Sequence, residues 1–427
     1  MTISIFKDFA EIRNQDRARF YFILFVCAFW CNACFLDFST VVIDKFIHFS
    51  GSRDFIKPLL FVVLAIKSWP YLNVRISSKN WLFFFCFGGL YLLNFLLFPQ
   101  NDEKLTNYLP DYFYAFLFFF LGVSIDIKEM KRFLWHASVL NLLCSAFYNL
   151  VFIQSAGYSG GAIEVGESVH DMPQAYYVLP SVIYVIWFTI ENFHFSELFK
   201  LSTLLNIALS VLGFLLESSF GTRGPVVCII AFVVLYVLIV KKTKHQFIYR
   251  FFIVTTGVVA YQFLNEFLLF MAGVTSAMGM SSRIFILALD NTFTQGESSS
   301  DERWMMIKMI KEELGQNSVE AYFGHGFTGF WDRLGGYPHN VVYEFLLTFG
   351  IIAGGFFILY IAYLLIKTYR KGKSAEIRGF LLVLISCGLV KLFMSSTFIS
   401  ETMFFMLIGY CISVLRNGNY LKYNHNS

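Results

Sequence analysis

The chain has 427 residues, of which 57% are hydrophobic and only 15% are charged, with a mean hydropathy of +0.61 and a formal net charge of +4. Soluble globular proteins carry more charge and fewer apolar residues than this. The apolar residues form continuous runs rather than alternating with polar ones, which favours spanning helices and excludes a β-barrel. We therefore expect an all-α fold, a polytopic transmembrane helical bundle. The basic residues lie in short loops rather than in one patch, so nucleic acid is not an expected partner.

A helix needs roughly 20 apolar residues to cross a bilayer, and this criterion predicts about twelve spans. The expected spans lie near 20–43, 55–72, 81–98, 108–125, 133–153, 173–191, 198–216, 225–240, 251–271, 339–366, 379–397 and 401–415. Lys57, Lys67 and Pro70 interrupt the second one. The first follows a long polar lead without a small-residue cleavage site, so it reads as a retained span. Together the spans predict a single integral membrane domain, 1–427.

Basic residues in the short loops predict the orientation of the chain, because Lys and Arg are enriched on the cytoplasmic side. With the N-terminus inside, the loops near 75–79, 128–132, 241–250 and 367–378 are basic and internal. The short external loops hold few basic residues, namely Lys45, Arg53, Lys104 and Arg223. Both termini are therefore expected in the cytoplasm, and the polar segment 272–338 outside.

The cysteines all fall within expected spans, so no disulfide is predicted. Cys27, Cys31 and Cys34 share a helix face, but no His or carboxylate joins them at metal-ligand spacing. Thiols that face lipid or core are the favoured interpretation.

The 272–338 segment is longer than an ordinary connection, which indicates a structured loop. Ser299 to Glu302 has the pattern of a capping box, and Gly315 suits a helix end, so a short helix is expected near 300–314. Trp304, Ile307 and Leu314 give it an apolar stripe, which predicts a position on the membrane surface or over a cavity.

Arginines on the outer side run against the charge rule, so each needs a reason. Arg223 lies in a tight turn between two spans and either reaches lipid phosphate or holds a phosphorylated substrate. Arg303 falls in the first turn of the loop helix, where it either pairs with neighbouring acids or joins that substrate site. Arg283 is a less distinctive candidate in the same loop.

The stretch Gly324 to Asn340 carries the densest set of candidate residues, including His325, Arg333 and His339. Pro338 suits the first turn of a helix, which would place His339 at a helix N-terminus, where backbone N–H groups favour an anion. A neutral imidazole there can take a proton from a hydroxyl, although a simple capping role is the alternative.

Residues four positions further along a helix share a face, so Tyr343 is expected beside His339 and Glu344 beside Asn340. Gly324 to Gly329 formally matches G-x-G-x-x-G, but without a βαβ unit it does not predict a dinucleotide site. Gly324 and Gly326 are expected to permit a tight turn or a close approach to a ligand.

Two further interpretations stay open. His325 and His339 with Asp301 or Asp332 could bind a metal, although no standard ligand spacing supports it, and no metal is expected. Asp37, Glu266 and Lys391 lie inside spans, where they either form an ion pathway, as in a transporter, or pair within the bundle.

The order of these motifs resembles the bacterial O-antigen polymerase and O-antigen ligase family. Arg223 stands in a short outer turn, Arg303-Trp304 opens a loop helix, and Gly324-x-Gly326 precedes His339-Asn340-x-x-Tyr343-Glu344 at the start of a span. The span continues to Phe349-Gly-Ile-Ile-Ala-Gly-Gly355, so the resemblance covers roughly 217–366. His325 falls where the family has no fixed histidine, and it is only a second candidate.

This resemblance implies an enzyme of the bacterial inner membrane with its active site facing the periplasm. Its donor would be an undecaprenyl-diphosphate-linked oligosaccharide, with Arg223 and Arg303 holding the diphosphate and His339 activating the acceptor hydroxyl. No cofactor is implied. A chain-length regulator and a flippase are possible partners beside the lipid bilayer. The Phe and Tyr content and the lack of a soluble domain favour a polymerase, with a ligase that transfers polymer to lipid A–core as the alternative.

Overall fold

The computed structural model describes residues 2–31, 52–148, 171–193, 195–220, 223–240, 264–277, 299–316 and 318–423. Every regular element in these ranges is a helix. The expected all-α class is therefore confirmed for the described part of the chain.

The chain forms two compact units, each built from two separate stretches of sequence. The first unit combines Met1–Tyr71 with Ile127–Gln295, and the second combines Leu72–Asp126 with Gly296–Ser427. Each unit is described by itself. The single membrane domain expected from the sequence stays a prediction.

Buried side chains of α9 form the core of the first unit. Its helices are α1 (Thr2–Gln15), α2 (Arg17–Trp30), most of α4 (Ser52–Arg75), α8 (Ile127–Tyr148), α9 (Asp171–Asn192), α10 (Leu201–Ser219), α11 (Arg223–Leu235) and α13 (Leu264–Ala277). Helix α9 packs against α8, α10 and α11.

Polar side chains join three helices of the first unit. Trp30 Nε1 donates to Ser138 Oγ at 2.8 Å, and Asn141 Nδ2 donates to Ser181 Oγ at 2.8 Å. Ser181 Oγ donates in turn to the Trp30 carbonyl at 3.3 Å. Such interhelical hydrogen bonds are a means of holding helices together where lipid offers no hydrophobic drive.

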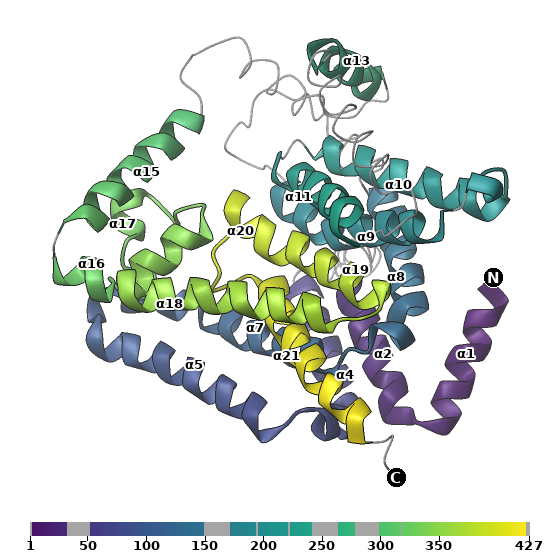
Figure 1. Ribbon diagram of the computed structural model, residues 1–427, viewed down its shortest axis with the longest axis horizontal. Coiled ribbons are helices and arrows are strands. Elements are labelled where there is room, and N and C mark those ends of the chain that lie inside the picture. The colour runs from purple at the N-terminus through teal and green to yellow at the C-terminus, as the bar shows by residue number, and fades with distance from the viewer. Residues whose placement is uncertain are drawn as a thin grey trace. The chain divides into compact units, whose positions relative to one another are not determined.

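The second unit contains most of the candidate residues. Its helices are α5 (Ser78–Leu97), α6 (Asp102–Asn107), α7 (Leu109–Ser124), α15 (Ser299–Gly315), α16 (Val319–Phe323), α17 (Trp331–Leu334), α18 (Val341–Lys371), α19 (Ala375–Leu384), α20 (Lys391–Met394) and α21 (Thr402–Tyr423). Figure 1 shows α15, α16 and α17 gathered at one end of α18. Helix α15 forms where the sequence predicts the loop helix.

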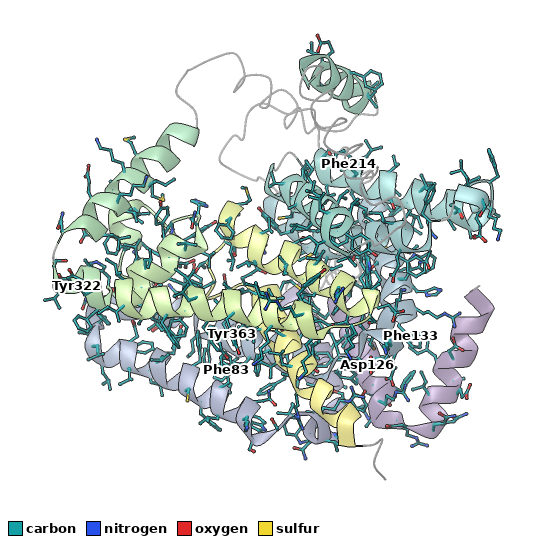
Figure 2. The ribbon with its side chains drawn as sticks, in the orientation of Figure 1. Phe83, Asp126, Phe133, Phe214, Tyr322 and Tyr363 are labelled. Carbon is teal, nitrogen blue, oxygen red and sulfur yellow. The ribbon has the colours of Figure 1, made fainter. Side chains whose placement is uncertain are left out.

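Helices α7 and α21 form the most extensive contact of this unit. A Cβ added at Gly122 would lie 2.2 Å from the Met406 carbonyl oxygen, and one at Gly409 would lie 2.1 Å from that of Phe119. The two glycines therefore let the backbones touch, as small residues do between membrane helices. Aromatic rings fill the space beside them. The ring of Phe83, which is labelled in Figure 2, stacks on that of Phe119 with centroids 4.7 Å apart.

Four described helices are long and apolar enough to cross a membrane: Ser78–Leu97, Leu201–Ser218, Val341–Lys371 and Ala375–Met394. Leu109–Ser124, Gly224–Val240 and Thr402–Arg416 are shorter apolar helices. The number is below the twelve expected, partly because charged residues such as Lys57 and Lys67 lower the hydropathy of α4. The expected spans 20–43, 133–153 and 251–271 also run into residues outside the described ranges.

Helices α5 and α18 turn large apolar side chains outward. Leu96 of α5 is 77% exposed, and Leu359 of α18 is 72% exposed. Outward apolar faces of this kind suit contact with lipid.

Loops expected on opposite sides of the membrane lie at opposite ends of the second unit. At one end Arg75 Nη1 donates to the Ser124 carbonyl at 3.0 Å, and Arg416 Nη1 donates to the Arg75 carbonyl at 2.9 Å. At the other end Asn101 Nδ2 donates to the His325 carbonyl at 3.0 Å. The side of the membrane expected for each of these loops stays a prediction.

Helix α18 is broken at Gly350, which has a φ of +77° and a ψ of 172°. The break leaves carbonyls without their intrahelical donors. His325 N–H donates to the Leu347 carbonyl at 2.8 Å, and Gly326 N–H donates to the Thr348 carbonyl at 3.1 Å. The loop after α16 therefore seats in the break.

We predict that Gly350→Ala lowers the stability of the protein. The added Cβ would lie 2.1 Å from the Tyr322 carbonyl oxygen, and the backbone conformation at Gly350, with a φ of +77° and a ψ of 172°, is essentially restricted to glycine and alone costs about 1–3 kcal/mol for a residue with a Cβ. Gly355→Ala in the same helix is the matched control, because nothing lies within 4 Å of its added Cβ. Thermal unfolding in detergent should show a clear loss for the first variant only; equal unfolding temperatures would contradict the break.

Candidate functional site

The loop after α16, residues 324–330, is called the Gly324 loop below. Three connections of the second unit meet at the end where this loop fits into the break of α18. They are the α5–α7 connection, the segment between α16 and α18, and the loop between α20 and α21. Tyr108 packs edge-on against Trp331 with ring centroids 5.0 Å apart, and Tyr337 Oη lies 3.4 Å from Ser395 Oγ. All three connections are expected outside by the charge rule.

Two asparagines fix the glycine loop to α5 and its continuation. Asn94 Oδ1 accepts a hydrogen bond from Phe327 N–H at 2.7 Å, and Asn101 Nδ2 donates to the His325 carbonyl. The two α18 carbonyls and Asn94 Oδ1 thus accept from the N–H groups of His325, Gly326 and Phe327. Neither asparagine is among the residues predicted from the sequence, although Asn94, an amide inside an apolar span, is a recognisable signal.

Gly324 and Gly326 approach protein rather than open space. An added Cβ at Gly324 would lie 2.3 Å from the Thr348 carbonyl oxygen, and one at Gly326 would lie 2.3 Å from Asn94 Oδ1. Their φ values of +85° and +76° also favour glycine. The close approach expected at these glycines is therefore to the α18 backbone and to Asn94.

His339 lies outside α18, directly before its N-cap, rather than in the first turn of the helix as the sequence predicts. Asn340 is the N-cap, and its Oδ1 accepts from Val342 N–H at 3.0 Å and Tyr343 N–H at 3.4 Å. Pro338 therefore precedes the helix instead of opening its first turn. Asn, Ser and Asp cap helices better than His does, because their short side chains place an oxygen within reach of these backbone amides.

The backbone of His339 is left-handed, with a φ of +51°, a conformation that is uncommon outside glycine. The imidazole packs on Tyr337 with centroids 4.3 Å apart, and its Nδ1 is buried. Because His339 is not helical, the expectation that Tyr343 shares its face is wrong. Tyr343 instead packs against the cluster of Ile310, Phe330 and Leu347.

Glu344 is 3% exposed and ties the start of α18 to the α20–α21 loop. One carboxylate oxygen accepts from Thr397 Oγ1, and the other accepts from Phe398 N–H at 3.2 Å. Neighbouring Ser396 is left-handed, with a φ of +74°. The sequence names Glu344 but gives no hint of Thr397, which lies 53 residues away.

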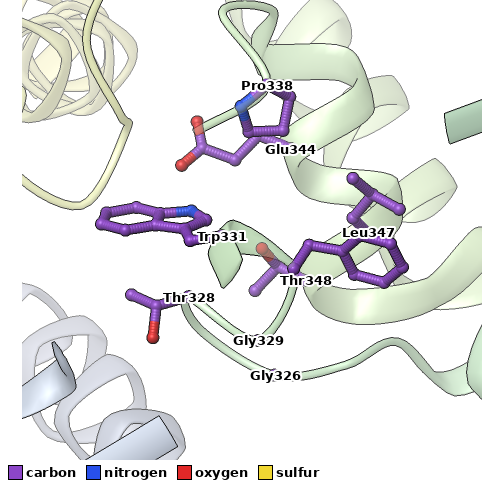
Figure 3. A pocket seen from close by; sticks show the side chains of 9 residues that line it. Gly326, Thr328, Gly329, Trp331, Pro338, Glu344, Leu347 and Thr348 are labelled. Atoms are coloured by element: carbon purple, nitrogen blue, oxygen red, sulfur yellow. The ribbon is translucent and has the colours of Figure 1, made fainter. Parts of the chain in front are cut away.

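A small cavity of about 10 Å³ lies beside these groups, with room for about one water molecule. Gly326, Thr328, Trp331, Pro338, Glu344 and Thr348 are among its lining residues. Figure 3 shows the indole of Trp331 between the carboxyl group of Glu344 and Thr328. Glu344 is therefore placed to offer an acceptor to a group that enters.

Thr328 is the most strained residue of the cavity wall. It is β-branched, yet its φ is +63°, and such a conformation is a genuine outlier that points to a functional or packing constraint. The side chain is 4% exposed, and its Oγ1 has no hydrogen-bond partner among the described residues.

Helix α15 packs against the outer side of the cavity wall. Ile310 is fully buried against Phe330 and Leu347, both of which line the cavity, and Met306 and Leu314 pack around them. Glu313 Oε1 lies 3.7 Å from His325 Nε2. Of the two positions predicted for this helix, the structure shows packing over a cavity wall, with Ile310 as its central residue.

The candidate arginines are placed less completely. Arg303 lies in the first turn of α15 and Arg333 in α17, but their side chains are outside the described set, and Arg283 lies outside the described residues altogether. Arg223 opens α11 in the first unit. Its expected proximity to the 272–338 loop stays a prediction.

The structure also bears on the metal site and the ion pathway that the sequence left open. Among the residues searched, no group of three His, Cys, Asp or Glu is arranged to hold a metal ion; the side chains of Asp301 and Asp332 lie outside that set. Lys391 Nζ pairs with Glu401, which is 2% exposed. Glu266 is exposed, and Asp37 lies outside the described residues.

We predict that Glu344 and Thr397 are energetically coupled. Removing one partner of a buried hydrogen bond leaves the other unsatisfied and costs about 1–3 kcal/mol, so Glu344→Gln and Thr397→Val should each lower the unfolding temperature. The double variant should lose less than the sum, with a coupling of about 0.5–3 kcal/mol. Strictly additive losses in a thermal-unfolding cycle would show that the bond contributes nothing.

No protein-family model matches the chain, and no curated protein matches its sequence significantly. The family resemblance of the motifs therefore stays a prediction.

Proposed function

We propose that the protein is a surface-polysaccharide (O-antigen) polymerase. It transfers an undecaprenyl-diphosphate-linked glycan onto a hydroxyl of another lipid-linked repeat unit at the periplasmic face of the bacterial inner membrane. The observation that carries this proposal is His339, which is held left-handed beside Tyr337 at the start of a broken apolar helix, where three connections meet.

The chemistry assigns His339 the role of general base. The imidazole takes the proton of the acceptor hydroxyl as its oxygen attacks the anomeric carbon of the donor. The bond from that carbon to the diphosphate oxygen breaks, and undecaprenyl diphosphate leaves with the electron pair. Fixed guanidinium groups stabilise the charge that develops on the leaving group, and the family resemblance gives this role to Arg223 and Arg303.

The orientation that the function needs agrees with the charge distribution of the second unit. Arg75, Lys371 and Arg416 lie at the end opposite His339, where each donates to a backbone carbonyl. Basic residues are enriched on the cytoplasmic side, which leaves the His339 end for the periplasm. The exposed apolar faces of α5 and α18 provide surface for the lipid bilayer and for the polyprenyl chain of the donor.

A transporter is the second candidate, and the break in α18 is the observation that favours it, because discontinuous helices form the substrate sites of many transporters. In this chain, however, the carbonyls at the break accept from His325 and Gly326 rather than facing an open site. Lys391, the expected member of an ion path, pairs with Glu401. A packing role for the break is the simpler explanation.

We predict that His339→Ala abolishes long-chain surface polysaccharide while the protein stays in the membrane. Loss of a general base slows transfer by about 10²–10⁴-fold. The measurement is the chain-length ladder of lipopolysaccharide on a gel after complementation of a deletion strain. His136→Ala is a matched control, because His136 lies on α8 in the other unit, and its ladder should be unchanged.

The same gel separates the two enzymatic alternatives. A product reduced to core plus one repeat, with ligation intact, indicates a polymerase. Loss of all surface O-polysaccharide with accumulation of lipid-linked polymer indicates a ligase, and a normal ladder in His339→Ala would refute both assignments.

We predict that the Lys391–Glu401 pair is structural. Lys391→Met leaves a buried carboxylate unpaired and should cost about 3–5 kcal/mol, whereas Lys391→Met with Glu401→Gln should recover part of this loss. The double variant should retain polymer. Proton uptake into vesicles, followed with a pH-sensitive dye, that is present in the native protein and lost in the double variant would instead indicate a transporter.

A further inference from the structure

Three aromatic residues at the His339 end differ from the aromatic core of the second unit. The core rings are fully covered: Phe119 is 0% exposed and Phe327 is 2% exposed. Tyr108, Trp331 and Tyr337 are only partly buried. They come from three connected but distinct places, namely the start of α7, helix α17 and the segment before α18. Packing of the core therefore does not account for them.

The three rings form a corner rather than a stack. Tyr108 and Trp331 meet at 87° with centroids 5.0 Å apart, and Trp331 and Tyr337 meet at 62° with centroids 6.2 Å apart. Edge-to-face contacts use the edge of one ring and one face of the next. Because the three rings are only partly buried, part of their surface is open to a flat apolar group. The apolar C–H face of a pyranose ring is a surface of this kind.

Polar groups adjoin the corner on two sides. Trp331 lines the cavity that also contains Glu344 and Thr328. Each oxygen of Glu344 accepts one hydrogen bond from the protein, and a carboxylate oxygen has two acceptor positions. The cavity has space for about one water molecule, which is also the space that a single hydroxyl group needs.

His339 joins the corner through Tyr337, with their centroids 4.3 Å apart. A sugar ring that packs on these aromatic faces would therefore lie next to the imidazole. Small-molecule sites commonly combine apolar and aromatic walls with a few placed polar groups, and this end of the second unit has both.

We propose that Tyr108, Trp331 and Tyr337 form the subsite for the acceptor sugar, and that one hydroxyl of this sugar enters the cavity beside Trp331. The inference rests on the proposed glycan transfer. The rings hold the sugar by its apolar face, and Glu344 accepts a hydrogen bond from the entering hydroxyl. A neighbouring hydroxyl of the same ring is then presented to His339. The corner thereby selects which hydroxyl reacts.

The first test measures binding without turnover. The probe is the free repeat-unit oligosaccharide, prepared by controlled cleavage of the surface polysaccharide of the source strain, and the readout is saturation-transfer NMR on protein in nanodiscs. Trp331→Ala should raise the Kd about tenfold, whereas Trp331→Phe should restore most of the affinity. Tyr360→Ala is the control, because Tyr360 is an exposed aromatic residue on the other part of α18, 43% exposed.

The second test measures transfer to a lipid-linked acceptor in vitro. Trp331→Ala should raise the acceptor KM about tenfold and change kcat much less. Tyr108→Leu, on a separate element, provides a second variant if Trp331→Ala fails to fold. Unchanged oligosaccharide binding and unchanged acceptor KM in the folded ring variants would overturn the subsite while leaving the proposed function intact. Retention of polymer by His339→Ala would instead overturn the proposed function itself.

Discussion

The candidate site depends on the seating of the Gly324 loop in the break of α18. A membrane helix that stops hydrogen-bonding to itself must have its open carbonyls satisfied by other protein groups, because lipid cannot supply donors. His325 and Gly326 supply them, and Gly324 and Gly350 remove the side chains that would prevent the contact. Asn94 and Asn101 then fix the same loop to α5 and its continuation. The positions of Trp331, Tyr337 and His339 follow from this seat.

Buried polar contacts hold the opposite side of the site. Glu344 binds the α20–α21 loop through Thr397 and Phe398, and Lys391 pairs with Glu401 in the same region. Charges buried in this way are costly unless each finds partners. The loop that faces Tyr337 is thus held in one position without a regular helix.

These constraints separate the packed helices of the second unit from the end that carries the candidate site. Helices α7 and α21 are locked together by backbone contact at Gly122 and Gly409 and by the surrounding Phe rings. Basic residues close one end, and the other end carries the aromatic corner, the cavity and His339. A strained Thr328 and a left-handed His339 both lie at that second end, which is where backbone strain is expected if the geometry serves a ligand.

The sequence by itself indicated a lipid environment and helical elements. Runs of apolar residues long enough to cross a bilayer satisfy their backbone hydrogen bonds within one segment only as helices. It located the loop helix from its cap and its glycine stop, and it brought His325, His339 and Glu344 to attention. Among the described residues, fewer helices than the twelve expected have the length and hydropathy of a span, since charged residues in α4 interrupt the apolar pattern and α7 and α11 are short.

Tertiary structure alone decided how those residues work. It made Asn340 the cap of α18 and left His339 outside the helix, and it turned the glycine pattern into a contact with a helix break. It also supplied partners that no local pattern could reveal, since Glu344 and Thr397 are 53 residues apart and Asn101 and His325 are 224 apart. Sequence periodicity reports which face of an element is apolar, whereas pairing across such separations is fixed only when the backbones pack.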